Sequence, residues 1–290
     1  MQFLAKWHAY YRLTRLDKPI GIWLLLWPTL WGLLIAGQGQ PRLWVVCVFV
    51  LGTILMRSAG CALNDIADRH WDGAVARTNK RPLATGEISV KEAYLVAIGL
   101  SLLAFALVCT LGWQVVLWSV PALFLAVSYP YTKRFFAIPQ AYLGIAFGFG
   151  IPMTFVALQG QVPAVAWWLL LANVCWSVAY DTAYAMVDRE DDLKIGIRSS
   201  AITFGRFDVL AIMGCFVAML LIVGYVAQVL ALGWPFWLGW GVAAAQLRRQ
   251  YRLIRHRQPG DCFKAFLENV WIGAALTAGL AASYCLSGLA

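Results

Sequence analysis

Two short acidic stretches, residues 63–72 and 180–192, contain the side chains most able to do chemistry. Together they hold eight of the 14 Asp and Glu residues in a chain that is 61% hydrophobic. Each stretch follows directly after a long apolar segment. A carboxylate in or beside a membrane is costly unless it binds a cation or faces water. The concentration of acid in these two places therefore predicts a functional site.

In the first stretch, helical spacing gathers the polar side chains on one face. At about 100° per residue, an amide and three carboxylates fall within an arc of roughly 100°, namely Asn64, Asp65, Asp68 and Asp72. Arg57 lies two turns earlier and falls on the same arc. The spacing predicts a face of oxygen atoms with one cation beside it.

The second stretch has a similar arrangement. Its three carboxylates, those of Asp181, Asp188 and Asp192, lie within an arc of about 40° when the residues are helical. The phenol of Tyr184 lies close to this face, whereas Glu190 points to the opposite side. The like spacing of the two stretches indicates an internal duplication of a four-helix unit within a single domain, residues 1–290.

Two faces that offer oxygen atoms, with no His or Cys at ligand spacing, favour a hard cation and so predict Mg²⁺. Because Mg²⁺ usually shares its coordination shell with phosphate oxygens, the substrate is expected to be phosphorylated. Positive partners for a diphosphate lie on the same face or in the loops that follow. They are Arg57, Arg77, Lys80, Arg81, Lys194 and Arg198.

The elements that must position these residues are membrane-spanning helices. Apolar runs of about 20 residues, the length that crosses the hydrocarbon core, recur along the whole chain. Each such run must satisfy its own backbone hydrogen bonds, which predicts an all-α polytopic membrane protein. The predicted spans are residues 20–36, 43–63, 93–111, 115–131, 138–157, 165–186, 208–231, 234–247 and 269–287.

The positive charges orient these spans. If the N-terminus is cytoplasmic, 21 of the 23 Lys and Arg residues fall in inside loops, which supports nine spans with the C-terminus outside. The same distribution accounts for the net charge of +9 without a nucleic-acid-binding patch. Lys133 and Arg134, after the fourth span, are interpreted first as topology anchors and second as ligands of an anionic co-substrate.

Both acidic motifs resemble those of the UbiA family of intramembrane prenyltransferases. They are Asn-Asp-x-x-Asp-x-x-x-Asp, from residue 64, and Asp-x-x-Tyr-Ala-x-x-Asp-x-x-x-Asp, from residue 181. The resemblance extends to residues 15–21 and 80–83 and to the nine predicted spans. Within the family, the chain looks most like the bacterial enzymes that prenylate 4-hydroxybenzoate in ubiquinone biosynthesis, on the evidence of residues 15–21, 26–31 and 184–192.

This resemblance implies nine transmembrane helices around a central cavity, under a cytoplasmic cap made by loops 64–92 and 187–207. It implies a location in the bacterial inner membrane with a periplasmic C-terminus. The implied substrates are polyprenyl diphosphate and 4-hydroxybenzoate, and the implied cofactor is Mg²⁺. The implied metal ligands are Asn64, Asp68, Asp72, Asp181, Asp188 and Asp192.

The implied reaction is ionisation of the allylic diphosphate, followed by attack of the carbocation on the aromatic carbon ortho to the hydroxyl. Asp65 is expected to lie behind the metal ligands. The residues implied to be catalytic are Asp68, Asp188, Asp192 and Tyr184. Those implied to bind substrate are Arg57, Asn64, Lys80, Arg81, Lys194 and Arg198, together with Arg134 for the carboxylate of the benzoate.

Two other functions share part of this pattern. An enzyme of the same superfamily with a different acceptor would carry the same metal motifs. A divalent-cation transporter would also use carboxylates, but it is expected to place them near the membrane midplane on a path that reaches the outside. Both stretches here lie at predicted cytoplasmic ends of spans, which favours the enzyme.

Overall fold

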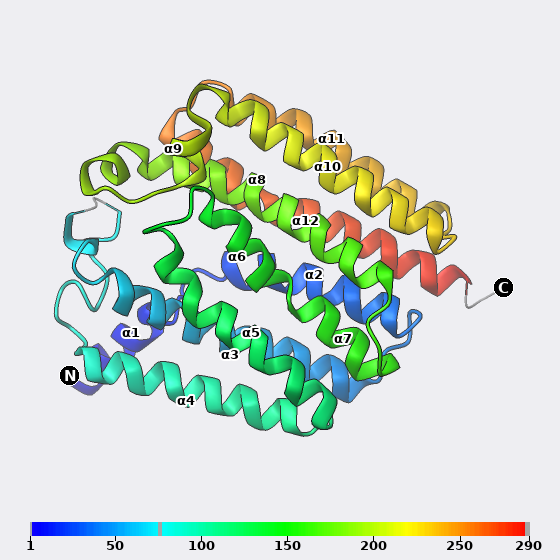
Figure 1. The fold of residues 1–290 in the computed structure, drawn as a ribbon, viewed down its shortest axis with the longest axis horizontal. Helices are drawn as coiled ribbons and strands as arrows, with labels where there is room; N and C mark the ends of the chain where they lie inside the picture. Colours follow the sequence, from blue (N-terminus) through cyan, green and yellow to red (C-terminus); the bar gives the residue numbers. More distant parts are fainter. Residues whose placement is uncertain (1, 75–76, 288–290) are drawn as a thin grey trace.

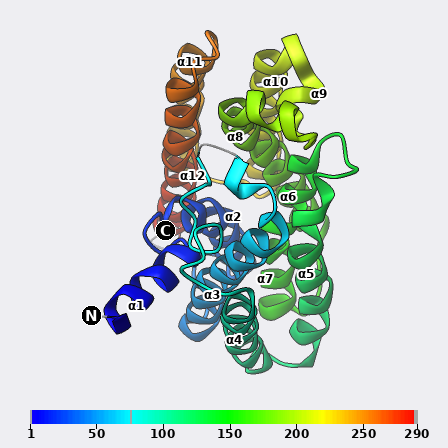
Figure 2. The same cartoon turned by 90° about the vertical axis from the view of Figure 1, so that its left-hand side faces the viewer.

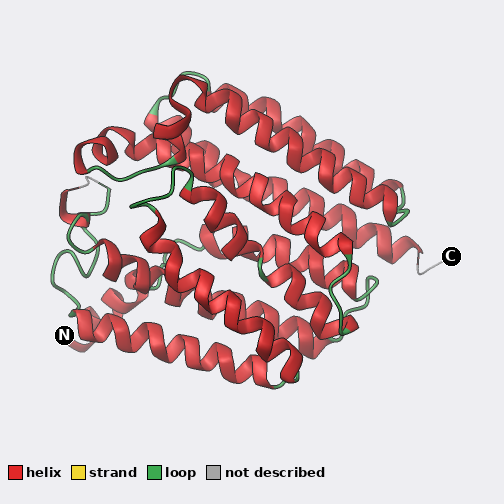
Figure 3. Ribbon diagram, in the orientation of Figure 1, coloured by secondary structure: helices red, strands yellow, loops and turns green. Residues whose placement is uncertain are grey.

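Every regular element of the structure is a helix, as the composition predicts (Figure 3). The computed structural model describes residues 2–74 and 77–287, and these ranges contain no strand. The helices are α1 (Gln2–Leu13), α2 (Ile20–Ala36), α3 (Leu43–Asp68), α4 (Val90–Cys109), α5 (Trp113–Thr132), α6 (Pro139–Gly148), α7 (Gly150–Gln159), α8 (Ala164–Ile195), α9 (Ser200–Phe204), α10 (Asp208–Val229), α11 (Trp234–Ile254) and α12 (Pro259–Ser287). Two short 3₁₀ helices, η1 (Asp72–Ala74) and η2 (Gly205–Phe207), complete the described elements.

Seven helical segments within the described residues are long and apolar enough to cross a membrane. They are α3, α4, α5, α6 with α7, α8, α9 with α10, and α12. Helices α2, which is apolar but has 17 residues, and α11 occupy the other two predicted positions. The chain is therefore a multi-pass membrane protein with a helix at each predicted span, and the count of nine crossings stays a prediction.

The long helices run side by side between two ends of the molecule (Figure 1). Helix α1, helix α9 and the segment that follows α3 gather at one end, while the C-terminus lies at the other. Figure 2 views the first of these ends and shows the segment after α3 lying across the bundle, between α12 and α6. The loops that follow the two acidic stretches are thus brought to the same end of the molecule.

Polar bonds in the interior hold α2, α8 and α12 together. Trp176 of α8 is fully buried and stacks on Trp31 of α2, with 5.5 Å between ring centroids. The indole N–H of Trp176 donates to Oδ1 of Asn269 in α12 (3.0 Å), and that of Trp31 donates to Thr277 (2.8 Å). Because a lipid environment offers no water to unpaired polar groups, these bonds also specify which helix faces meet.

The membrane segment between α5 and α8 is broken into α6 and α7 at Phe149. Asn173 of α8 donates to the carbonyl oxygen of Gly144 in α6 (2.8 Å). A Cβ atom at Gly148 would lie 2.6 Å from the same amide nitrogen. Glycine at 148 therefore lets the end of α6 approach α8 closely, about two turns before the second acidic stretch.

Two predictions near the acidic stretches are wrong, namely the helical continuation as far as Asp72 and the start of the second cap loop at residue 187. Helix α3 ends at Asp68, so Asp72 lies in η1 and not one turn further along the same helix face. A hydrogen bond from Thr78 Oγ1 to the carbonyl oxygen of Asp72 (2.8 Å) holds this turn. Helix α8 instead continues to Ile195, so the first part of the predicted cap loop 187–207 is helical. It continues because no Gly or Pro interrupts it before Gly196, whose φ of 73° ends it.

Candidate active site

A large cavity of about 1430 Å³ lies among the membrane helices, and both acidic stretches line it. The side chains of Asn64 and Asp68 line it from α3, those of Asp181 and Asp188 from α8. Asp72 and Asp192 also belong to its wall. The six residues predicted to bind metal, which come from segments more than 100 residues apart in the sequence, therefore share one cavity.

At the end of α3, a lysine binds the first two of these residues. Lys133 follows α5, and its Nζ lies 2.6 Å from Oδ2 of Asp68 and 3.3 Å from Oδ1 of Asn64. The amide nitrogen of Asn64 donates to the same Asp68 oxygen (3.1 Å). A half-buried ammonium group thus occupies the position beside the carboxylate where a cation would bind.

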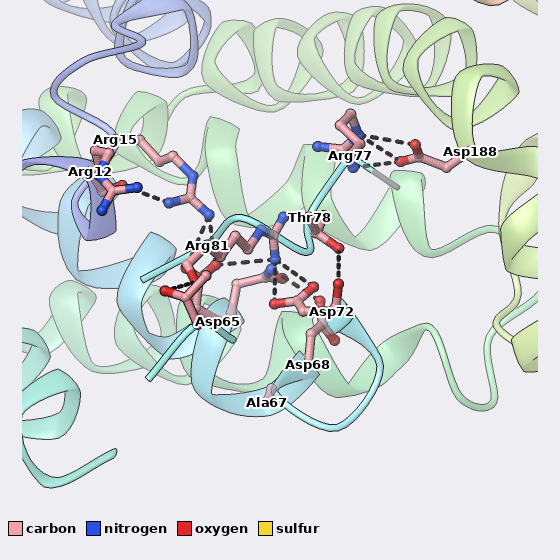
Figure 4. Close-up of polar contacts among 12 residues, drawn as sticks. Arg12, Arg15, Asp65, Ala67, Asp68, Asp72, Arg77, Thr78, Arg81 and Asp188 are labelled. Carbon is pink, nitrogen blue, oxygen red and sulfur yellow. Dashed lines mark hydrogen bonds and ion pairs between the residues drawn. The ribbon is translucent and has the colours of Figure 1, made fainter. Parts of the chain in front are cut away.

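A chain of alternating charges holds the rest of the first stretch (Figure 4). Nη1 of Arg81 lies 2.9 Å from both carboxylate oxygens of Asp72 and 3.1 Å from Oδ1 of Asp65. Asp65, which is 1% exposed, also accepts two hydrogen bonds from Nη2 of Arg15 (2.8 and 3.0 Å). Burial raises the pKa of Asp72 above its ordinary value, and the charge of Arg81 opposes that rise. Asp65 is thus a buried residue of the cavity lining that holds Arg15 and Arg81, and its place behind the metal ligands stays a prediction.

The second stretch lies on consecutive turns of α8, so its three carboxylates share one helix face as predicted. Arg77, in the loop after the first stretch, donates from Nε to both oxygens of Asp188 (3.0 Å each) (Figure 4). The same guanidinium lies over the ring of Tyr184, 4.5 Å from its centroid. This arginine joins the two acidic stretches, and the approach of the two stretches depends on the tertiary fold.

The donor set fits a hard cation. The six predicted metal ligands all offer oxygen atoms to one cavity, and among the described residues Cys61 is the only His or Cys in its lining. Within the described part of the chain, no three His, Cys, Asp or Glu side chains are close enough together to hold a metal ion, because Lys and Arg side chains bind several of the carboxylates. Cation binding would require these basic groups to be released, and each released group would then be available to an anionic substrate.

The predicted substrate-binding residues separate into two groups. Arg57, Lys80, Arg81 and Arg198 line the cavity. Arg134 does not: its Nη2 donates to the carbonyl oxygen of Ala67 (3.2 Å). Its guanidinium lies over the ring of Trp71, which lines the cavity, and over that of Tyr131, which does not.

Lys194 is also outside the cavity lining. Its side chain is 71% exposed and pairs with Asp191 of the same helix (3.2 Å).

Three residues line the cavity that the sequence does not predict as site residues. The sequence indicates first of all a topology anchor at Lys133, yet its Nζ contacts Asp68 of the first acidic stretch. Tyr129, one turn before it, and Arg15, which contacts Asp65, also border the cavity. One signal in the sequence points to Lys133: it follows a span at the same predicted side of the membrane as both acidic stretches. Its neighbour Arg134 has the same position, so the local sequence does not distinguish the two residues.

The fold and the cavity define a class of protein, namely a helical membrane protein with two opposed acidic faces at one end of an intramembrane cavity. The chain belongs to the UbiA prenyltransferase family, whose model matches residues 25–278.

The relatives of this chain cover nearly its whole length. It is 62% identical to the 4-hydroxybenzoate octaprenyltransferase of Methylobacillus flagellatus, over 96% of this chain and 94% of that protein. It is 60% identical to the protein of the same name from an Azoarcus species, over 96% of each chain.

Solved structures show the same fold. A UbiA homologue from Aeropyrum pernix in the apo state matches with a TM-score of 0.80 at 23% identity, over 93% of this chain and 98% of that one. A homologue from Archaeoglobus fulgidus bound to GPP and Mg²⁺ matches with a TM-score of 0.72 at 20% identity, over 95% and 99% of the two chains.

Proposed function

We propose that this protein transfers a polyprenyl group from polyprenyl diphosphate to the 3-position of 4-hydroxybenzoate. The observation that carries the proposal is the single cavity that brings both acidic stretches together in a chain 62% identical to an octaprenyltransferase of that acceptor. The greater part of the cavity wall is apolar and suits an isoprenoid tail. The basic end of the molecule would face the cytoplasm of a bacterial cell whose inner membrane holds the helices.

Six residues would hold Mg²⁺, with Asn64, Asp68 and Asp72 on one side of the cavity and Asp181, Asp188 and Asp192 on the other. When bound, the metal neutralises charge on the diphosphate and so assists its departure. The presence of GPP and Mg²⁺ in the homologue from Archaeoglobus fulgidus supports this assignment.

The basic side chains that pair with the carboxylates have a second role in this proposal. Arg77, Arg81 and Lys133 each contact a predicted metal ligand at 3.0 Å or less. A cation that binds the carboxylates would release them, and they would then donate to the diphosphate oxygens together with Lys80. The same groups that compensate the carboxylates before binding would thus stabilise the leaving group afterwards.

The reaction then needs a site from which water is excluded. Cleavage of the C–O bond leaves both electrons on the diphosphate and produces an allylic carbocation. The aromatic carbon ortho to the hydroxyl forms the new C–C bond, and the proton on that carbon is lost. The apolar and aromatic wall, which includes Tyr184 and Phe266, would protect the carbocation from water.

Arg57 is the better candidate for the carboxylate of the acceptor, because Arg134 lies outside the cavity. Arg57 lines the cavity and forms no ion pair with any described residue. Its buried Nε has no hydrogen-bond partner among the described residues. A guanidinium without an ion pair in a largely apolar cavity favours a bound carboxylate.

The test is a transfer assay in membranes that contain the protein, supplied with 4-hydroxybenzoate, a short allylic diphosphate and Mg²⁺, with and without EDTA. Metal-dependent 3-prenyl-4-hydroxybenzoate is the expected product, and Asp68→Ala and Asp188→Ala should abolish it. Release of diphosphate without a benzoate product would refute the acceptor and retain the metal chemistry. If neither reaction occurs and Mg²⁺ crosses the membrane, the protein is a transporter.

A further inference from the structure

Asp208 is a fully buried carboxylate, 0% exposed, that the proposed reaction does not use. It is the first residue of α10, and it binds two arginines from different parts of the chain. Arg257, in the loop between α11 and α12, donates from Nε to both oxygens (3.0 and 3.1 Å) and from Nη2 to Oδ1 (2.7 Å). Arg189 of α8 donates from Nη1 to Oδ2 (3.2 Å). One carboxylate therefore joins α8, α10 and the loop before α12.

Further hydrogen bonds hold this cluster of Asp208, Arg189 and Arg257. The backbone N–H of Val209 donates to Oδ1 of Asp208 (2.6 Å), and Nη2 of Arg257 also donates to the carbonyl oxygen of Arg206 (2.9 Å). Arg257 has a φ of 56°, a left-handed conformation that a non-glycine residue adopts at some cost. A buried carboxylate persists only when it is paired, and here the pairing compensates that backbone cost.

The cluster contacts the part of α8 that carries the metal-binding face. Arg189 directly follows Asp188 and lies about 100° further round the helix, so it points away from the cavity toward α10. The last buried residue of α8 is Met186, and the residues from 187 to 195 are half-buried or exposed. Side-chain packing alone therefore fixes this terminal part of α8 weakly.

Ion pairs join residues 187–195 to other elements, among them Asp188 with Arg77 and Arg189 with Asp208. The first involves a carboxylate that the proposed function assigns to the metal, so that pair would be lost when the metal binds. The second is outside the cavity lining and would persist. The contact of Arg189 with Asp208 is therefore one that metal binding would leave in place.

We propose that Asp208 is a positioning residue, which acts through Arg189 to hold the end of α8 so that Asp188 and Asp192 face the cavity. The proposal rests on the proposed function for the role of those two carboxylates. Asp181 lies before Met186, in the well-packed part of α8, and does not depend on this contact.

The test compares Arg189→Met with Glu268→Gln. Arg189→Met removes the contact with α8 but leaves Asp208 paired with Arg257, so the buried carboxylate stays compensated. Glu268→Gln removes a different arginine–carboxylate pair, Arg249 with Glu268 (2.7 Å), which joins α11 to α12. Asp208→Asn is the second variant, and Arg189→Lys tests rescue by a shorter cation.

Two readouts are measured on purified protein in detergent. The first is hydrogen exchange of a peptide that covers residues 187–195, which needs no substrate and no activity. The second is the dissociation constant of Mn²⁺, followed by its electron paramagnetic resonance signal in the presence of an unreactive prenyl thiolodiphosphate. If the competent conformation of α8 falls to about one fifth of the population, the apparent dissociation constant rises about fivefold.

We expect Arg189→Met and Asp208→Asn to speed exchange in residues 187–195 and to weaken Mn²⁺ binding about fivefold, with partial recovery in Arg189→Lys and no change in Glu268→Gln. Unchanged exchange in Arg189→Met would overturn the proposal. Faster exchange with unchanged Mn²⁺ binding would show that the contact orders α8 without positioning the site, and would also overturn it. Failure of the proposed function is a separate result, because wild-type protein would then bind Mn²⁺ without forming product.

Discussion

The contact between Lys133 and Asp68 makes a sharp prediction about metal binding and stability. In Lys133→Met, a side chain of similar length no longer compensates Asp68. Loss of one partner of a buried pair costs about 3–5 kcal/mol, and loss of an exposed pair costs about 1 kcal/mol or less. The side chains of Asp68 and Lys133 are 10% and 22% exposed, which places this pair between those limits.

From this intermediate burial we expect a loss of about 2 kcal/mol in the free energy of unfolding without Mg²⁺. For a chain of this size each kcal/mol lowers Tm by roughly 2–4 °C, so Tm should fall by about 4–8 °C. In saturating Mg²⁺ the difference in Tm between Lys133→Met and wild type should be less than half of its value without Mg²⁺, because the metal replaces the lost ammonium group at Asp68.

The assay is thermal unfolding of the purified protein in detergent, with and without Mg²⁺. Lys194→Met is the matched control, since it removes a lysine–aspartate pair whose lysine is 71% exposed. That variant should change stability by less than about 0.5 kcal/mol. An equal fall in Tm for Lys133→Met with and without Mg²⁺ would refute the reasoning, because it would show that the metal does not bind at Asp68.

Three further predictions concern the cavity and its walls. Asp192→Asn should lower kcat/KM at least about 100-fold if its charge stabilises the transition state through the metal, and a kinetic assay at saturating Mg²⁺ in which activity persists would contradict this. Arg57→Lys should raise KM for 4-hydroxybenzoate about tenfold with a smaller effect on KM for the diphosphate, because an ammonium group lacks the planar fork that binds a carboxylate; equal effects on both constants would count against the assignment. Gly148→Val should destabilise the protein by about 1–3 kcal/mol in thermal unfolding, since a Cβ atom there would lie 2.6 Å from Asn173, and an unchanged Tm would show that α6 and α8 can separate at no cost.

The sequence alone predicts the helical membrane fold and the six acidic and amide side chains that line one cavity. Hydropathy determines where helices cross the membrane, and positive charge in the loops predicts their orientation, because both depend on local transfer energies. The carboxylate face of α8 could also be predicted from spacing, since residues 181–192 form one uninterrupted helix. In the first stretch the same reasoning placed Asp68 correctly and failed for Asp72, because a turn begins after Asp68 and local spacing carries no information about the loop beyond it.

Only the tertiary structure decided which charges meet. Lys133 and Arg134 are adjacent in the sequence, yet Lys133 lines the cavity and binds Asp68, whereas Arg134 is outside the lining and stacks on Trp71. The contact of Arg189 with Asp208 likewise depends on how α8 packs against α10. Ion pairs between distant segments are set by the relative rotation and depth of whole helices, and these are determined by packing throughout the bundle. The sequence by itself therefore determines which residues are available for the site, and the packing of the helices decides which of them face the cavity.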